Sequence, residues 1–144
     1  MKQKFSTSWL SSKQVRKQRK YRYNAPLHLR HKFVSAHLSK ELREKYGKRS
    51  IPVRKGDEVL IMRGNFAKKK GKILNTDLKR NRVTIEGINR KKSDGTKVNV
   101  YFDTSNLLIQ GLNLEDRKRI KALSRGKSKE DNKDKDVSDK STNN

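Results

Sequence analysis

The sequence predicts a mainly β protein: a small barrel flanked by a basic, partly helical N-terminal extension, a short C-terminal helix and a disordered tail. Three observations support this prediction. Apolar and polar residues alternate in five short stretches between residues 51 and 111, the pattern typical of half-buried strands. Turn-forming residues separate these stretches. The preceding residues 1–50 contain too little apolar surface to form a core of their own.

Residues 1–50 are therefore predicted to form an extension with short helices. They contain 15 Lys or Arg against 2 Asp or Glu. Pro26 suits the first turn of one helix, where its missing N–H has no cost. A second helix is predicted with Ser39 as N-cap, Glu41 in the first turn and Gly47 at the end.

Residues 51–111 are predicted to form the barrel. Closing so few short strands into a barrel removes exposed edges and gathers the apolar side chains into one core. The Asp94-Gly95 pair predicts a hairpin turn, and Thr84 is expected to point outward. The side chains expected to point into the core are those of Val59, Ile61, Ile73, Val83, Ile85, Val98, Val100, Phe102, Leu107 and Ile109.

Residues 112–126 are predicted to form a helix, with Asn113 or the neighbouring acids near its start and cations toward its end. Residues 127–144 contain almost no apolar side chains, and we expect them to be disordered.

The composition predicts a partner of opposite charge. The chain has 144 residues, a net charge of +24 and only 30% hydrophobic residues. Such a charge repels itself in a compact state unless a polyanion neutralises it. The longest apolar run, VLIM, is far shorter than the roughly 20 residues of a spanning helix, and the first residues do not resemble a secretory signal. The absence of Cys excludes disulfides and thiolate metal sites. We therefore expect a soluble, intracellular, polyanion-binding protein.

A cationic loop bounded by glycines lies between the first two predicted strands. Its lysines at 68–70 offer point charges to phosphates, and the ring of Phe66 offers a face for stacking. Gly64 and Gly71 can adopt positive φ and let the backbone approach a partner. The alternative is an ordinary solvated hairpin loop, but the large net charge favours phosphate binding.

The basic run RKQRKYRYN is a second candidate for contact with RNA. Tyr21 and Tyr23 lie among its cations and are expected to stack on unpaired bases. A tail without a specific partner and a nuclear localisation signal are the alternatives. The side chains expected to neutralise phosphates are those of Arg16, Lys17, Arg19, Lys20 and Arg22.

Metal binding and catalysis find little support. His28, His31 and His37 have no Cys or nearby acidic residue to complete a metal site, so RNA contact or solvation is favoured. No nucleophile has an adjacent base to orient it. Asp57 and Glu58 are expected on opposite faces of a strand and, like the other acids, to pair with lysines. We therefore expect no enzyme activity, cofactor, metal or small-molecule substrate.

Several stretches of the sequence resemble known proteins. KGDEVLIMRGNFAKKKGKILN…NRVTIEG is similar to the KOW motif, a strand–loop–strand element of small SH3-like barrels in ribosomal and transcription proteins. RKQRKYRYNAPLHLRHKFVSAHLSKELREKYGKRSIPVRKGD resembles the N-terminal extension of the archaeal and eukaryotic forms of a large-subunit ribosomal KOW protein. This family is numbered twenty-four in bacteria and archaea and twenty-six in eukaryotes. SDGTKV and DTSNLLIQGLNLEDRKR also fit, so the resemblance extends over residues 13–125 and is closer to archaeal members.

The resemblance implies a structural protein of the large ribosomal subunit in the cytoplasm. It implies direct binding to the 5′ region of large-subunit rRNA, a role in initiating subunit assembly, and a position near the polypeptide exit tunnel beside other ribosomal proteins. The protein is expected to be monomeric there, without membrane contact. The expected RNA-binding residues are Arg16, Lys17, Arg19, Lys20, Tyr21, Arg22, His28, Arg30, His31, Lys32, Arg49, Arg54, Lys55, Arg63, Asn65, Phe66, Lys68, Lys69, Lys70 and Lys72, with Gly64 and Gly71 as loop glycines.

The loop departs from the family at one point. Relatives often have a Lys-Gly pair soon after the aromatic residue, whereas here Phe66 is followed by Ala67 and Lys68. If that glycine normally adopts positive φ, the loop is expected to follow another path.

Two other functions remain open on the sequence. Transcription elongation factors also contain KOW domains, although another globular domain normally precedes theirs. A generic nucleic-acid packaging protein would need only the charge, and it would bind DNA and RNA about equally.

Overall fold

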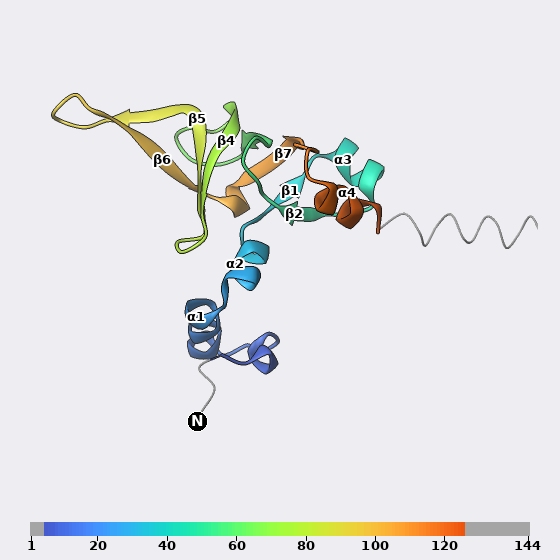
Figure 1. Ribbon diagram of the computed structural model, residues 1–144. Helices are drawn as coiled ribbons and strands as arrows, with labels where there is room; N and C mark the ends of the chain where they lie inside the picture. Colours follow the sequence, from blue (N-terminus) through green and yellow to red (C-terminus); the bar gives the residue numbers. More distant parts are fainter. Residues whose placement is uncertain (1–4, 126–144) are drawn as a thin grey trace, which may run out of the picture.

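The computed structural model describes residues 5–125, so the predicted disordered tail at 127–144 lies outside the described residues. Figure 1 shows a curled sheet from which one hairpin and the first helices project. The elements are η1 Thr7–Trp9, α1 Val15–Asn24, α2 Leu27–Phe33, β1 Ser35–Leu38, α3 Lys40–Tyr46, β2 Ser50–Pro52, β3 Glu58–Ile61, β4 Lys70–Asp77, β5 Arg82–Lys91, β6 Lys97–Asp103, η2 Thr104–Asn106, β7 Leu107–Gly111 and α4 Arg117–Ser124.

The predicted mainly β, barrel-like fold is confirmed, but the sheet does not close. Seven strands follow the order β2-β1-β7-β3-β4-β5-β6, which leaves β2 and β6 as edges of the described sheet. The pairing of β4 with β5 shifts register between Ile73 and Asn75. Such an irregularity bends a strand and increases its twist, so the sheet curls around one core without joining its edges.

Part of the predicted extension belongs to the sheet. β1 pairs in parallel with β7, with Leu38 opposite Ile109, and antiparallel with β2. Val34, Ala36 and Leu38 are each at most 1% exposed, so this segment contributes directly to the core. The fold of residues 51–111 is thus completed by residues that precede it in the sequence.

The core matches most of the predicted inward positions. Val59, Ile61, Ile73, Val83, Ile85, Leu107 and Ile109 are buried. The predictions for Thr84 and Val98 were wrong. Thr84 is buried beside Val83 and Ile85, and its hydroxyl has no hydrogen-bond partner among the described atoms. Val98 is exposed because it lies in the projecting part of the hairpin, beyond reach of the core.

The hairpin of β5 and β6 forms an arm, residues 89–99, that projects from the sheet (Figure 1). Pairing passes from Thr84–Tyr101 to Asn89–Asn99, so β5 contains a bulge of several residues at the base of the arm. Gly87 lies in this bulge with a φ of 77°. Every residue of the arm is exposed.

The predicted Asp94-Gly95 turn closes the arm. Gly95 has a φ of 84°, and its N–H donates to the carbonyl of Lys92 at 3.1 Å. The hydroxyl and the N–H of Thr96 both donate to the Asp94 carboxylate, at 2.7 and 2.9 Å. These hydrogen bonds favour the ionised form and hold the pKa of Asp94 below its ordinary value.

The predicted caps of α3 are confirmed. The Ser39 hydroxyl accepts a hydrogen bond from the Leu42 N–H, and Gly47 ends the helix with a φ of 61°. The C-terminal helix begins at Arg117 rather than at residue 112, and its N-cap Asp116 is one of the acids expected near its start. Among residues 5–125, no helix is long and apolar enough to cross a membrane.

Candidate nucleic-acid interface

The loop between β3 and β4 is held by backbone hydrogen bonds. Ile61 N–H donates to the carbonyl of Lys69 at 2.9 Å, and Lys68 N–H donates to that of Ile61 at 2.8 Å. Within the loop, Ala67 N–H donates to the carbonyl of Gly64 at 3.0 Å, and Gly64 has a φ of 91° as expected of a loop glycine. The frame is therefore ordered, and the side chains that it exposes are Arg63, Asn65, Lys68, Lys69 and Lys70.

Phe66 is less available than the sequence suggested. Its ring packs edge-on against Phe102, with centroids 5.9 Å apart, and it is only partly exposed against the core. The ammonium of Lys69 lies 5.4 Å from the same ring. Phe66 thus anchors the loop to the barrel, and its ring is engaged within the protein rather than offered to a base.

Gly71 serves a different purpose from the expected one. It lies in β4 opposite Val59 and does not have positive φ. A Cβ atom at this position would lie 2.6 Å from the Ile85 methyl carbon Cγ2 and 3.1 Å from the carbonyl oxygen of Glu86. Gly71 is therefore needed for close packing of β4 on β5, and the free φ expected of it is not used.

Lys68 itself has a φ of 68°, so this loop contains positive φ without a glycine at that position. The lysine thus adopts the conformation that a glycine would supply, so the reason for expecting another path is removed.

Helix α1 presents the basic run. Its cations Arg16, Lys17, Arg19, Lys20 and Arg22 are all exposed. Tyr21 departs from the prediction, because it is only 4% exposed and its ring packs between Phe5 and Phe33, at centroid distances of 5.1 and 5.8 Å. Tyr23, by contrast, is 80% exposed.

Gln18 was not recognised from the sequence as part of this region. Its side-chain amide donates to the carbonyls of Trp9, Leu10 and Ser12, at 2.9, 3.1 and 2.7 Å. These bonds fasten the segment before α1 onto the helix. The inner face of α1 is thus occupied by Gln18 and Tyr21. Among its exposed cations, Lys20 places its ammonium 5.3 Å from the centroid of the Trp9 ring. A polar residue inside a basic run gives no sequence signal for this role.

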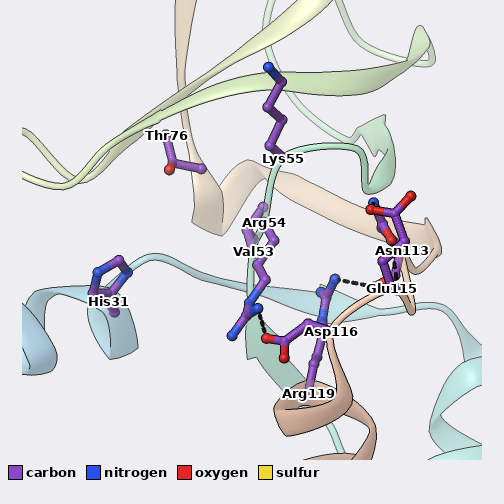
Figure 2. Close-up of a pocket in the computed structure, with 9 residues that line it drawn as sticks. All are labelled: His31, Val53, Arg54, Lys55, Thr76, Asn113, Glu115, Asp116 and Arg119. Atoms are coloured by element: carbon purple, nitrogen blue, oxygen red, sulfur yellow. Dashed lines mark hydrogen bonds and ion pairs between the residues drawn. The ribbon is translucent and has the colours of Figure 1, made fainter.

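A cleft of about 380 Å³ brings three further candidates together (Figure 2). His31 comes from α2, whereas Arg54 and Lys55 come from the turn before β3. Arg54 is paired with Asp116, so its charge is partly neutralised. The cleft is lined by His31, Val53, Arg54, Lys55, Thr76, Asn113, Glu115, Asp116 and Arg119.

The remaining candidates are dispersed. Arg30 donates to the backbone carbonyls of Tyr23 and Ala25, at 2.6 and 2.9 Å, and so joins α2 to the end of α1. Lys72 pairs with Glu58 at 3.7 Å. The exposed candidates outside these groups are His28, Lys32 and Arg49.

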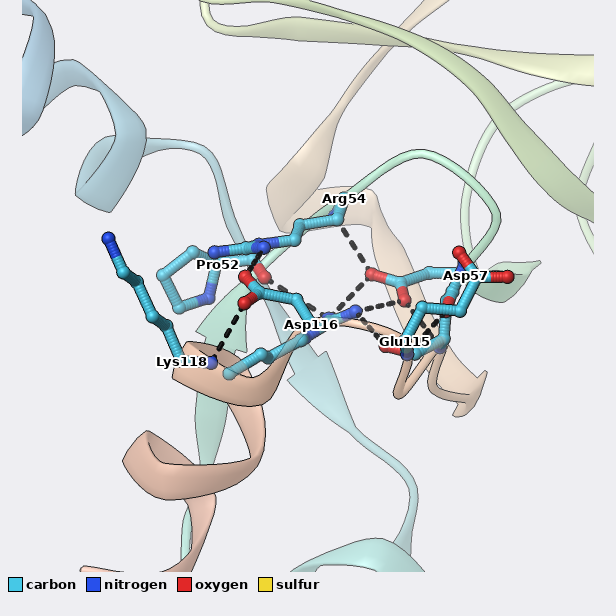
Figure 3. Close-up of polar contacts among 8 residues, drawn as sticks. Pro52, Arg54, Asp57, Glu115, Asp116 and Lys118 are labelled. Atoms are coloured by element: carbon cyan, nitrogen blue, oxygen red, sulfur yellow. Dashed lines mark hydrogen bonds and ion pairs between the residues drawn. The ribbon is translucent and has the colours of Figure 1, made fainter.

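Figure 3 shows polar contacts around Asp57. They include a buried ion pair that was not predicted from the sequence. Asp57 is fully buried and accepts hydrogen bonds from both terminal nitrogens of Arg119, at 2.5 and 2.7 Å. The same carboxylate accepts from the backbone N–H of Arg54 and Asn113, at 2.8 and 3.0 Å. The pair therefore fixes α4 to the start of the barrel. Its two residues are 62 positions apart in the sequence, so no local sequence pattern predicts the pair.

Residues 5–125 contain no group of three His, Asp or Glu side chains arranged to hold a metal ion. The described surface instead has separate groups of exposed cations, on α1 and on the loop between β3 and β4. Such sets bind phosphate groups without covalent chemistry.

Comparison with known proteins shows the family to which the chain belongs. The family that comprises the eukaryotic ribosomal proteins L26 and their archaeal L24 counterparts matches residues 12–126. "Large ribosomal subunit protein uL24" of Methanothrix thermoacetophila is 50% identical over 114 residues, 79% of this chain and 98% of that protein. The protein of the same name from Methanosphaera stadtmanae is 48% identical over 114 residues, 79% and 97% of the two chains. That of Korarchaeum cryptofilum is 50% identical over 109 residues, 76% and 83%. The chain therefore belongs to this family of archaeal and eukaryotic ribosomal proteins.

Proposed function

We propose that this protein binds the 5′ region of large-subunit rRNA directly, helps to initiate assembly of the subunit and lies near the polypeptide exit tunnel. Family membership makes the chain a structural component of the large ribosomal subunit in the cytoplasm, and not an enzyme. The proposal adds the region of RNA, the direct contact and the position among neighbouring ribosomal proteins.

The observation that supports direct RNA binding is the absence of internal counter-charge at two sites. Among residues 5–125, ion pairs involve Arg54, Lys72, Arg80, Arg82 and Arg119. The exposed cations of α1 and the lysines at 68–70 form none within that range. Unpaired cations held on an ordered frame favour phosphate contacts, because binding then requires little further ordering.

The two sites have different frames. The loop is closed by backbone hydrogen bonds and anchored by Phe66, whereas α1 is anchored by Gln18 and Tyr21. Phosphate contacts position a protein on RNA but do not select sequence. We therefore assign selection of the 5′ region to the spacing of the two sites on folded RNA.

The test is binding to a transcript of the 5′ domain of large-subunit rRNA from the same organism, measured over a range of salt concentrations. Replacing Lys68, Lys69 and Lys70 together with Ala is expected to weaken binding. Each lost phosphate contact should also reduce the slope of log affinity against log salt by about 0.7 to 0.9.

The matched control replaces Lys40, Lys118 and Lys121 with Ala, which removes the same charge from exposed positions on α3 and α4. It should retain most of the affinity and slope. Equal losses in the two triple variants would contradict a localised interface. Equal binding of the native protein to duplex DNA would instead indicate a packaging protein.

A further inference from the structure

The backbone of Lys68 is unusual for its residue type. Among the non-glycine residues from 5 to 125, only Lys68 and Asn81 have positive φ, at 68° and 55°. Asn is favoured in this conformation because its short polar side chain can bond locally, whereas Lys gains no such compensation. Lys68 therefore holds a strained conformation that its own side chain does not explain.

The surrounding loop imposes this conformation. Lys69 N–H donates to the carbonyl of Phe66 at 3.2 Å, closing a four-residue turn in which Lys68 is third. Turns with positive φ at the third position normally place glycine there. The bonds between Ile61 and Lys68–Lys69 fix the turn to the ends of the strands, so the strain cannot relax by moving the loop.

The three lysines of the loop are not equivalent. The Lys69 ammonium lies over the Phe66 ring, and Lys70 is a β4 residue opposite Leu60. Lys68 is exposed at the turn, and none of the ion pairs within residues 5–125 involves its ammonium. A glycine at this place would relieve the strain but would supply no charge.

We propose that Lys68 is the principal phosphate-binding residue of the loop, and that the protein retains a strained backbone there because glycine would remove the contact. Strain of this kind persists where the surroundings over-determine it, and it is concentrated at functional sites. The inference rests on the proposed binding of rRNA by this loop and specifies which residue makes the contact and at what cost to stability.

The test compares single substitutions for opposite effects on stability and binding. Lys68→Gly should raise the melting temperature of the free protein and lower its affinity for the 5′-domain transcript several-fold. Its salt slope should fall by about 0.7 to 0.9, as for one phosphate. Lys68→Asn should lose the same affinity, because asparagine tolerates positive φ but has no charge. Lys68→Arg should retain it.

Lys69→Gly is the matched control, because it removes the same charge from the next residue, which does not have positive φ. It should lower the melting temperature and reduce affinity less than Lys68→Gly does. If Lys68→Gly fails to raise the melting temperature, or loses no more affinity than Lys69→Gly, the inference is wrong. If the triple alanine variant also binds normally, the proposed loop interface fails with it. If the result for Lys68→Gly contradicts the inference but the triple alanine variant binds RNA weakly, only the assignment to Lys68 is overturned.

Discussion

At the scale of single residues, Asp57 joins three parts of the chain through one carboxylate. It binds the backbone ahead of β3, the backbone ahead of α4 and the guanidinium of Arg119. All of these groups must lose their water, so the carboxylate stabilises the fold only while every bond is made. From the sequence, Asp57 is expected to pair with a lysine on a strand, because local sequence does not show that residue 119 returns to residue 57.

Replacing Asp57 with Asn should destabilise the protein by about 3–5 kcal/mol, because it leaves the Arg119 charge buried without a counter-ion. Urea unfolding of the free protein would measure this loss. The control is Glu58→Gln, the neighbouring residue, whose pair with Lys72 is exposed and separated by 3.7 Å. That change should cost less than about 1 kcal/mol. Equal costs for the two substitutions would contradict the structural role of Asp57.

At the scale of elements, α1 is a positively charged helix with an anchored inner face. Tyr21 packs between Phe5 and Phe33, and Gln18 ties the preceding turn to the helix. The sequence suggested that Tyr21 stacks on RNA bases, since a tyrosine among cations is typical of that role. Local sequence could not reveal the ring's partners, because Phe5 and Phe33 lie in different segments on either side of α1.

Tyr21→Leu separates the two roles of this ring. A leucine can fill an apolar site between two phenylalanines but cannot stack on a base. Packing therefore predicts nearly unchanged RNA affinity and α1 content, measured by transcript binding and circular dichroism. A stacking role would instead cost about 1–3 kcal/mol of binding free energy. Tyr23→Leu, at an exposed position, is the control that reports any genuine stacking in this region.

The arm formed by β5 and β6 is expected to contribute little to stability, in contrast to Asp57. Removing residues 90–98 and joining Asn89 to Asn99 through an Asn-Gly turn should change the free energy of unfolding by less than about 0.5 kcal/mol, because every residue removed is exposed. Chemical denaturation would measure the change. A loss of several kcal/mol would show that the arm supports the core.

At the scale of the whole molecule, the sequence predicted the part of the fold that depends on local alternation. β3, β4, β5, β6 and β7 were recognised because apolar residues such as Val59 and Ile61 recur at every second position. β1 was missed because a four-residue strand is too short to show that period, and its parallel pairing with β7 is a long-range contact. A short strand from the extension and a buried ion pair with α4 thus complete the fold from outside residues 51–111.

In the candidate interface too, some features follow from local sequence and others depend on contacts that local sequence does not show. Exposure of the basic residues in α1 and the loop follows from their charge and was expected. The packing of Gly71 and Phe66 depends on the distance to Ile85 and on the Phe102 ring, and Lys68 differs from other lysines in a backbone angle. None of these features has a local signature in the sequence.

The most direct test of the central claim is ultraviolet crosslinking of intact large subunits, with identification of the joined nucleotides and peptides by mass spectrometry. We expect peptides containing residues 15–24 and 63–72 to be joined to nucleotides in the 5′ region of large-subunit rRNA. Crosslinks that map mainly to α3 and α4, or to RNA outside the 5′ region, would contradict it.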